Sequence, residues 1–569
     1  MNFRKFKKSW SKLFAATVVA FTLNGCGDSE NFVFTNGGLA PIPDPVLQAP
    51  VANNDTVVAL GNATLSQLQA NGVLNNDQVN GAEITSFDSA TTNGGTVDLN
   101  SDGSFTYTPV FGFTGQDSFT YTLANSEGSS TATVTLNVDD QGWFVNNSVT
   151  TNGNGSQANP FDNLPDALAE AGAGDTIFVF AGDGTNNNQA GAIDLPPGVN
   201  LIGQANGLVL GQQIEAAGAR PVIQGPVRLG GDNTVAGFEM TNSGEECIEG
   251  DSVDNVQILN NIFNTPAEEH VELLDVGGTC TISGNSFNAL TGDDRSLVID
   301  LTDVTATYAV DGNTFESDTT NDPNNAADID TRGTTNLTLS FTNNDITSIN
   351  DANRWDDGLE LDVAEQSTVT VSIDGNTVNR TSSDGIDLDT NDALATLTGT
   401  VSGNTLENIG DNGIEVDSDR GTISLTVSGN IVRDVNQDGI DLDVEGTDGS
   451  VTAIVENNQV TNCGVNGLST GAEATGSSCT VAFRNNTVTN STLASLFGRT
   501  LLTGEMCLDV TGNTVDDDMI FDNDGTFLRV EQLEAGQGGP LNTVNTFQSG
   551  SGVDNQGATS VDDGTCVFP

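Results

Sequence analysis

The sequence predicts an all-β fold, in which a solenoid of stacked coils follows a small β-sandwich. The first observation is an asparagine that recurs every 24 to 32 residues, with an apolar residue two positions later. A repeat of that length indicates a solenoid. The second is the abundance of Asn, Thr, Val, Asp and Gly with only 6% aromatic residues, which is typical of strands and turns. The recurring asparagines are Asn261, Asn285, Asn313, Asn344, Asn376, Asn404, Asn430, Asn458, Asn486, Asn513 and Asn545.

The N-terminus has the pattern of an export signal. A basic stretch precedes an apolar run over 13–23, which is too short to cross a membrane as a stable helix. The run ends at Cys26 in a sequence that resembles a bacterial lipobox, although Asn24 replaces the usual small residue. The resemblance implies a lipoprotein signal peptide over 1–25 and lipidation of the Cys26 thiol. The alternative is an ordinary cleaved signal with a spare cysteine.

A flexible tether is expected over 26–50, because its prolines favour an extended linker. The chain would then be exported and lipid-anchored, at the outer membrane or cell surface of a bacterium. Its membrane contact would be through the lipid anchor alone.

Residues 51–139 predict the β-sandwich. Alternating runs such as 104–108 and 118–122 are separated by Asn-Gly and Asp-Gly turns. Val73–Asp77 (Val-Leu-Asn-Asn-Asp) and the Gly-Phe-Thr-Gly-Gln-Asp run from Gly112 resemble bacterial Ig-like/cadherin-like modules. The resemblance implies a spacer or adhesion unit, sometimes with calcium.

The second body is expected over 142–547. Asn159–Leu164 precedes a short helical stretch at 165–171 and an apolar strand at 174–179. This arrangement resembles the N-terminal cap of pectate-lyase-like right-handed parallel β-helices, in which the helix covers the open end of the solenoid. The resemblance implies a right-handed parallel β-helix. An irregular tail over 548–569 follows.

Each repeat contains strands that alternate apolar and polar residues. In one of them, Ile386 and Leu388 lie on one face while Asp387 and Asp389 lie on the other. One coil cannot bury its apolar face alone, so stacked coils form the core. The amide of each recurring asparagine both donates and accepts, which predicts hydrogen bonds from one asparagine to the next along the axis.

Alignment of the repeats on these asparagines predicts two outward columns of acids. The first holds Glu272, Asp300, Asp330, Glu360, Asp387, Glu415 and Asp441, and the second holds Asp362, Asp389, Asp417 and Asp443. Parallel strands lie about 4.8 Å apart, so the carboxylates should raise one another's pKa or gather cations. Hard oxygen ligands favour Ca²⁺. The expected metal ligands are Glu360, Asp362, Asp387, Asp389, Glu415, Asp417, Asp441 and Asp443. The alternative is a salt-adapted acidic surface.

Catalysis is a second possibility for this face. Paired carboxylates can hydrolyse glycosides, and the pectate-lyase-like superfamily includes polysaccharide lyases. The weak catalytic candidates are Arg332, Glu360, Asp387 and Glu415. The His-Gly and Arg-x-Lys elements of polygalacturonases are absent, and the only histidine, His270, is expected to be a partly exposed strand residue. Trp355 could stack on a sugar at the lip of the sheet, or pack at the edge of a loop.

The net charge limits which partners the protein can bind, and the cysteines indicate the compartment in which it folds. The net charge of −62 disfavours nucleic acid and anionic lipid surfaces. An even number of cysteines after Cys26 in an exported chain suggests disulfides. Proximity in sequence favours the pairs Cys247–Cys280, Cys463–Cys479 and Cys507–Cys566, and Cys479–Cys507 is a rival because the two lie on successive repeats.

Three functions therefore stay open. The first is a cell-surface lipoprotein whose β-helix binds carbohydrate or a surface protein, with calcium as a stabilising ion. The second is a calcium-dependent polysaccharide lyase or glycoside hydrolase. The third is a purely structural component of a surface layer.

Overall fold

The computed structural model describes residues 47–569, except 187–188, 211, 242–243, 265, 267, 289–294, 318–323, 351–353, 532–544, 548–552, 557–558, 562–565 and 567–569. The chain divides into two compact units, 1–48 and 49–569. The signal peptide, Cys26, most of the tether and most of the tail expected at 548–569 lie outside the described residues. Among the residues that are described, no helix has the length and apolar character needed to span a membrane.

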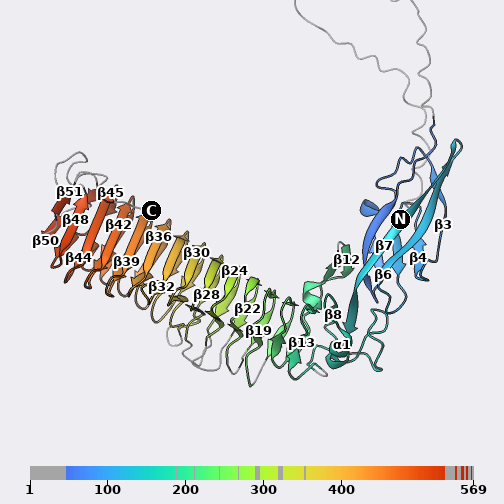
Figure 1. The fold of residues 1–569 in the computed structure, drawn as a ribbon, viewed down its shortest axis with the longest axis horizontal. Coiled ribbons are helices and arrows are strands. Elements are labelled where there is room, and N and C mark those ends of the chain that lie inside the picture. The colour runs from blue at the N-terminus through green and yellow to red at the C-terminus, as the bar shows by residue number, and fades with distance from the viewer. Residues whose placement is uncertain are drawn as a thin grey trace, which may run out of the picture. The chain divides into compact units, whose positions relative to one another are not determined.

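The larger unit begins with a β-sandwich (Figure 1). One sheet has the order β3–β6–β7–β1 and the other β2–β5–β4. Phe105, Tyr107, Phe119 and Tyr121 are buried between them. The elements are β1 (Asp55–Gly61), β2 (Leu65–Gln67), η1 (Gln69–Asn71), β3 (Glu83–Phe87), β4 (Thr96–Leu99), β5 (Phe105–Thr108), β6 (Gly115–Asn125) and β7 (Gly128–Val145).

Strand β7 belongs to both bodies. It pairs with β6 in the sandwich, and its last residues, Gly142–Val145, pair in parallel with β8 (Thr176–Val179) of the solenoid. The boundary expected between 139 and 142 is thus crossed by a continuous strand.

A short helix, α1 (Leu164–Glu170), caps the start of the solenoid. Asn163 is its N-cap and accepts a hydrogen bond from the backbone N–H of Asp166 at 2.9 Å. Proline in the first turn and an acid beside the positive end of the helix dipole explain why the helix begins here. The expected cap helix is therefore confirmed, and its Leu164 side chain is buried in the core.

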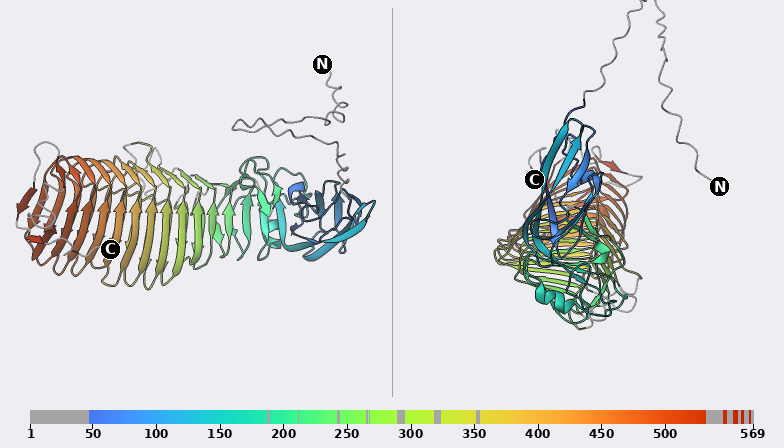
Figure 2. Two further views of the ribbon diagram at one scale, coloured as in Figure 1. Left: turned by 90° about the horizontal axis from the view of Figure 1, so that it is seen from above. Right: turned by 90° about the vertical axis from the view of Figure 1, so that its right-hand side faces the viewer.

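The coils stack along the axis of the solenoid (Figure 2, left). Each coil contributes one strand to each of three parallel sheets, called A, B and C in the order in which a coil visits them. Sheet A contains β9 (Ile193–Asp194), β14 (Val227–Leu229), β17 (Ile248–Asp251), β20 (Val271–Leu274), β23 (Leu297–Thr302), β26 (Ala327–Arg332), β29 (Leu359–Val363), β32 (Ile386–Thr390), β35 (Ile414–Ser418), β38 (Ile440–Val444), β41 (Asn466–Ala472), β44 (Ala494–Thr500), β47 (Met519–Asn523) and β50 (Val553–Gln556).

Sheet B contains β8, β10 (Asn200–Gly203), β15 (Thr234–Ala236), β18 (Gln257–Leu259), β21 (Gly278–Ser283), β24 (Thr305–Asp311), β27 (Asn336–Thr342), β30 (Thr368–Asp374), β33 (Thr396–Ser402), β36 (Thr422–Ser428), β39 (Ser450–Glu456), β42 (Ser478–Arg484), β45 (Glu505–Thr511), β48 (Phe527–Glu531) and β51 (Thr559–Val561). A hairpin of β11 (Leu208–Leu210) and β12 (Gln212–Glu215) follows η2 (Gln204–Asn206) near its start.

Sheet C contains β13 (Val222–Gln224), β16 (Glu239–Thr241), β19 (Ile262–Asn264), β22 (Ser286–Asn288), β25 (Thr314–Glu316), β28 (Asp345–Thr347), β31 (Thr377–Asn379), β34 (Thr405–Glu407), β37 (Ile431–Val435), β40 (Gln459–Cys463), β43 (Thr487–Ser491), β46 (Thr514–Val515) and β49 (Thr546–Phe547).

Inward-facing apolar residues from all three sheets make one continuous core from Trp143 to Val530. Like residues stack in neighbouring coils. The rings of Phe263, Phe287 and Phe315 lie parallel, with centroids 5.1 and 4.6 Å apart. The all-β solenoid behind a sandwich that the sequence predicts is therefore confirmed.

The recurring asparagines form a buried ladder at the turn between sheets B and C. The Nδ2 of Asn404 donates to Asn430 Oδ1 and to the carbonyl of Ile373, each at 3.0 Å. Its Oδ1 accepts from the backbone N–H and the Nδ2 of Asn376, each at 2.9 Å. The same pattern continues without a gap from Asn261 to Asn545. The predicted bonding along the axis is confirmed.

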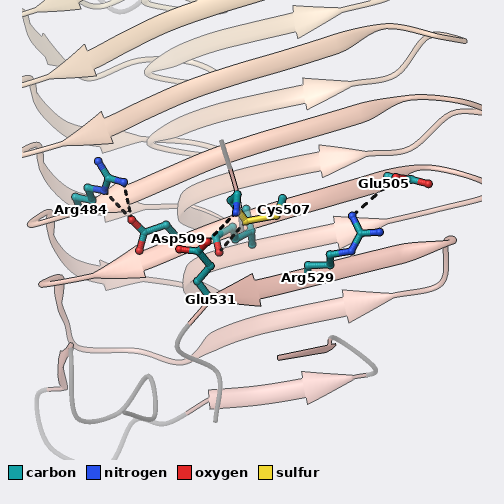
Figure 3. The surroundings of a disulfide bond; sticks show 8 residues. Arg484, Glu505, Cys507, Asp509, Arg529 and Glu531 are labelled. Atoms are coloured by element: carbon teal, nitrogen blue, oxygen red, sulfur yellow. Dashed lines mark hydrogen bonds and ion pairs between the residues drawn. A yellow bond between two sulfur atoms is a disulfide. The ribbon is translucent and has the colours of Figure 1, made fainter. Parts of the chain in front are cut away.

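One disulfide joins Cys507 in β45 to Cys566 (Figure 3). The backbone N–H of Cys566 also donates to Glu531 at 2.7 Å, which holds Cys566 against sheet B. The rival pair Cys479–Cys507 does not form. Cys479 faces Met506 in the register and points into the core, whereas Cys507, one residue further on, points outward.

The other expected disulfides are not present. The residues Cys247, Cys280, Cys463 and Cys479 are buried thiols. Cys247 precedes a strand of sheet A, whereas Cys280 lies in sheet B; likewise Cys463 ends a strand of sheet C and Cys479 lies in sheet B. Proximity in sequence does not predict disulfide pairing here, because successive strands of a coil belong to different faces of the solenoid.

Candidate functional site

A six-residue motif opens four successive strands of sheet A. It reads Asp or Asn, then Gly, an apolar residue, an acid, an apolar residue and Asp. It occupies 357–362, 384–389, 412–417 and 438–443, at β29, β32, β35 and β38. The third and fifth residues are buried in the core, so the fourth and sixth point outward.

The strand register defines the two acidic columns directly. The first column is Asp328, Glu360, Asp387, Glu415 and Asp441, and the second is Asp300, Asp330, Asp362, Asp389, Asp417 and Asp443. All eight residues expected as metal ligands lie in these columns. The sequence alignment is wrong for Asp300 and Asp330, which belong to the second column, and it omits Asp328. Loops of different length precede β23 and β26, so counting from the ladder asparagine misplaces their acids. The first column is interrupted at Val298, which separates Glu272 from the rest.

The first residue of each motif forms a second polar ladder, which the sequence reasoning missed. The backbone N–H of Asp384 donates to Asp357, that of Asn412 to Asp384, and that of Asp438 to Asn412, at 2.6 to 2.9 Å. The ladder begins at Asn325 and ends at Asn466. The signal was an Asp or Asn before each glycine of the motif.

The glycine of the motif lets adjacent coils approach closely. A Cβ added at Gly413 would overlap the carbonyl oxygen of Gly439 and the side chain of Val432. This close packing keeps the motifs in register, and hence aligns their carboxylates.

Carboxylate oxygens converge at the centre of this face. Ligand atoms of Asp384, Asp387 and Glu415 all lie within 4.8 Å of one another. Asn412 Nδ2 donates to Glu415 Oε2 at 3.1 Å. Several buried oxygens have no hydrogen-bond partner among the described residues, namely one Oδ1 each of Asp387, Asp389, Asp417, Asp441 and Asp443. Buried acceptors without donors are uncommon in proteins.

The pKa values of these carboxyls shift upward. Burial, with repulsion from Asp328 and Asp357, raises the pKa of Glu360 to about 7. Burial, with repulsion from Glu445, raises the pKa of Asp417 to about 7. Burial and mutual repulsion also raise the pKa values of Asp387, Asp389, Asp441 and Asp443. Without a cation, several of these groups hold protons near neutral pH.

Arginine compensates the acids on the N-terminal side of this face. Arg332 contacts Asp300 at 3.1 Å and Asp330 at 2.8 Å, and 48% of its side chain is exposed. Arg295 contacts Asp328 at 2.8 Å. Arg332, a weak catalytic candidate, therefore already forms ion pairs with its acidic neighbours.

The columns lose their acids on the C-terminal side. Ser469 follows Asp441 in the first column, and Gly471 follows Asp443 in the second. In the described strands β29, β32, β35 and β38, no column position carries a basic residue. The uncompensated carboxylates, called the acidic face below, are therefore confined to these four coils.

A smaller acidic group lies nearer the N-terminus. Ligand atoms of Glu246, Glu269 and Glu272 also lie within 4.8 Å of one another. Arg295 contacts Glu269 at 3.4 Å and supplies positive charge to this group. Burial, with repulsion from Glu246, raises the pKa of Glu272 to about 7.

His270 is fully buried, so the expectation of a partly exposed strand residue is wrong. Its ring nitrogens lie 3.1 Å from Ser296 Oγ and 3.1 Å from the carbonyl of Asn288. It packs against the stacked rings of Phe263 and Phe287. Burial lowers its pKa to about 4. His270 is a core residue and does not reach the acidic face.

Trp355 is also fully buried, which excludes the sugar-stacking role considered for it. Its backbone pairs with Thr381 in an isolated bridge, and its backbone N–H donates to Ser348 Oγ at 2.9 Å. The residue fills the core beside the acidic face.

The fold and this face define a chain with an Ig-like module ahead of a parallel β-helix that carries an acidic column pair. Residues 47–137 match the bacterial Ig domain family. This match confirms the bacterial Ig-like resemblance and suggests an extracellular or surface location. Among solved structures, the chain is similar to the Azotobacter vinelandii mannuronan C-5 epimerase AlgE6 A-module, with 14% identity and a TM-score of 0.28, over 70% of this chain and 93% of that one. At this TM-score the likeness carries no inference about activity. No curated protein matches.

Proposed function

We propose that this chain is an exported bacterial surface protein whose acidic face binds Ca²⁺ and, through the loaded face, a surface ligand. The ligand is a carbohydrate or another surface protein. The Ig-like module acts as a spacer, and a lipid on Cys26 anchors the protein. Nucleic acid is not a partner, because the net charge of −62 repels it.

The observation that carries the proposal is the set of buried carboxylate oxygens without hydrogen-bond partners on β32, β35 and β38. Burying a charge without a partner is costly, and a hard divalent cation supplies what these oxygens lack. Ca²⁺ takes six to eight oxygen ligands in flexible geometry. Adjacent coils offer carboxylates and the amide of Asn412 at one place.

A calcium-dependent polysaccharide lyase or glycoside hydrolase is the alternative. The observation in its favour is Glu360, whose pKa of about 7 suits a general acid. It lies in register with Asp387 on the next coil and with Glu415 on the coil after that. The engagement of Arg332 by two acids removes the most basic candidate for proton abstraction.

Incubation with a panel of neutral and acidic glycans, with Ca²⁺ and with chelator, separates these functions. Calcium-dependent retention without shortening of the glycan is expected. Reproducible depolymerisation that the triple change Glu360→Gln, Asp387→Asn and Glu415→Gln abolishes would establish the enzyme instead. Retention of no glycan and of no protein from the same cell surface would leave a purely structural role.

A further inference from the structure

The outer face of sheet B differs from the acidic face in composition. Three columns run along strands β24, β27, β30, β33, β36, β39 and β42, and all their members are at least partly exposed except Ala482, which is buried. The first is Thr305, Asn336, Thr368, Thr396, Thr422, Ser450 and Ser478; the second is Thr307, Thr338, Thr370, Thr398, Ser424, Thr452 and Thr480; the third is Ala309, Ser340, Ser372, Thr400, Thr426, Ile454 and Ala482. We call these three columns the hydroxyl face.

The hydroxyl face carries no charged residue, although the chain has 78 acids. The neighbouring fourth column does carry charges, at Asp311, Asp374, Glu456 and Arg484. Charge is therefore absent from a defined area rather than from the sheet as a whole. A neutral area of this kind on a strongly acidic protein favours an uncharged partner.

The spacing of the hydroxyl face is regular in two directions. The register between successive strands shows no shift from β24 to β42. In the second column hydroxyls therefore repeat about every 4.8 Å across the strands, and neighbouring columns lie about 6.6 Å apart along the strands. Gly399, with φ of +142°, preserves this register where an added Cβ would overlap the carbonyl oxygen of Val371.

Most of these hydroxyls are available to solvent. The hydroxyl oxygens of Thr370 and Thr398 lie 3.3 Å apart, as do those of Ser450 and Thr422. Within the described residues, the other side-chain hydroxyls of the second column make no hydrogen bond to protein. The face also lacks aromatic rings, on which a sugar could stack. It offers methyl groups and unoccupied hydroxyls in a fixed two-dimensional array.

We propose that the hydroxyl face binds ice. Water molecules bonded to the threonine hydroxyls and ordered around the methyl groups take up the two repeats of the array. Oxygen atoms in hexagonal ice repeat at a distance close to the spacing across the strands, so this water layer joins the crystal lattice. An uncharged face does not impose the strong radial hydration that charges would. This inference goes beyond the proposed function and uses a different face of the solenoid.

The test is partition of the full chain into slowly growing ice, together with inhibition of ice recrystallisation. The probe is ice in dilute buffer, with an inert globular protein as reference. The wild type is expected to be several-fold enriched in the ice fraction. The double change Thr370→Arg and Thr398→Arg should abolish this enrichment, because it puts bulk and charge in the centre of the array.

The matched control changes two threonines that are also in register, Thr377→Arg and Thr405→Arg, on the outer face of sheet C. This variant should partition like the wild type, and thermal melting should show both variants folded.

Exclusion of the wild type from ice would overturn the proposal, and so would full enrichment of the hydroxyl-face variant in the ice fraction. Binding to crystalline cellulose or chitin at room temperature that only the hydroxyl-face variant loses would also overturn it, in favour of a neutral polysaccharide. The change Asp387→Asn with Asp389→Asn should leave ice partition intact, which separates this result from the calcium proposal.

Discussion

At the scale of single residues, the asparagine ladder shows how one side chain connects three coils. Asn404 accepts from Asn376 and donates to Asn430 and to the carbonyl of Ile373. The side chain is fully buried, so no water replaces these bonds. The ladder therefore contributes stability and fixes the register that aligns the outer columns.

Truncation of one ladder residue should be costly. Asn404→Ala leaves buried donors of Asn376 and the carbonyl of Ile373 without their partner, at about 3–5 kcal/mol in the free energy of unfolding. Denaturant unfolding measures the change. Gln437→Ala, which shortens an exposed amide, is the control and should cost under about 0.5 kcal/mol. Equal effects of the two changes would contradict a bonding role for the ladder.

The buried histidine should make stability depend on pH in the acid range. The pKa of His270 is about 4 in the folded chain, against 6.5 for an unperturbed histidine. The unfolded state then binds more protons, so the stability that His270 contributes is complete above pH 6.5 and is lost as pH falls toward 4, by up to about 3 kcal/mol. The difference in unfolding free energy between wild type and His270→Gln should shrink over that range. For Phe287→Leu, a core change without a titrating group, the difference should stay constant.

At the scale of elements, each position of the motif on β29, β32, β35 and β38 has its own structural role. Alternating residues fill the core and form the acidic columns. The preceding Asp or Asn ties each coil to the next through a backbone N–H. The glycine permits the close contact between coils. Fold and site are therefore encoded in the same six residues.

The glycine should be intolerant of even one methyl group. Gly413→Ala places a Cβ against Gly439 and Val432, and overpacking of this kind costs about 1–3 kcal/mol. Thermal melting measures it. Gly172→Ala, where an added Cβ meets nothing within 4 Å, is the control. A variant at Gly413 as stable as the control would show that coil contact here is looser than described.

Much of this architecture could be predicted from sequence because it is periodic. Ile386 and Asp387 reveal by alternation which side faces the core, and Asn404 marks the turn. The column membership of Asp300 and Asp330 could not be obtained by counting, because loop length varies between coils while strand pairing does not. The burial of His270 and Trp355 depends on how loops pack. Loops have no repeating pattern of apolar residues, so a single sequence does not predict this burial.

At the scale of the whole molecule, the acidic face should couple calcium, protons and stability. Glu360 and Asp417 have pKa values of about 7 in the folded chain, whereas unfolded acids titrate near about 4. In chelator the folded state binds more protons between about pH 4 and 7. For these groups the unfolding free energy therefore falls as pH rises through that window and is level above it.

Melting curves with chelator and with Ca²⁺ check this coupling. Ca²⁺ replaces the protons, so its stabilising effect should be larger at pH 8 than at pH 5. The change Asp387→Asn with Asp389→Asn should abolish the calcium effect at pH 8. A shift in melting temperature that is the same at both pH values would contradict the competition between proton and cation.

The most direct measurement is calorimetric titration of chelator-stripped protein with CaCl₂ at pH 8. The account predicts saturable binding that Asp387→Asn with Asp389→Asn abolishes. The control, Glu316→Gln with Asp345→Asn, removes two exposed acids from sheet C and should bind like the wild type. Absence of saturable heat in the wild type, or equal binding by the two variants, would contradict a calcium site at the acidic face.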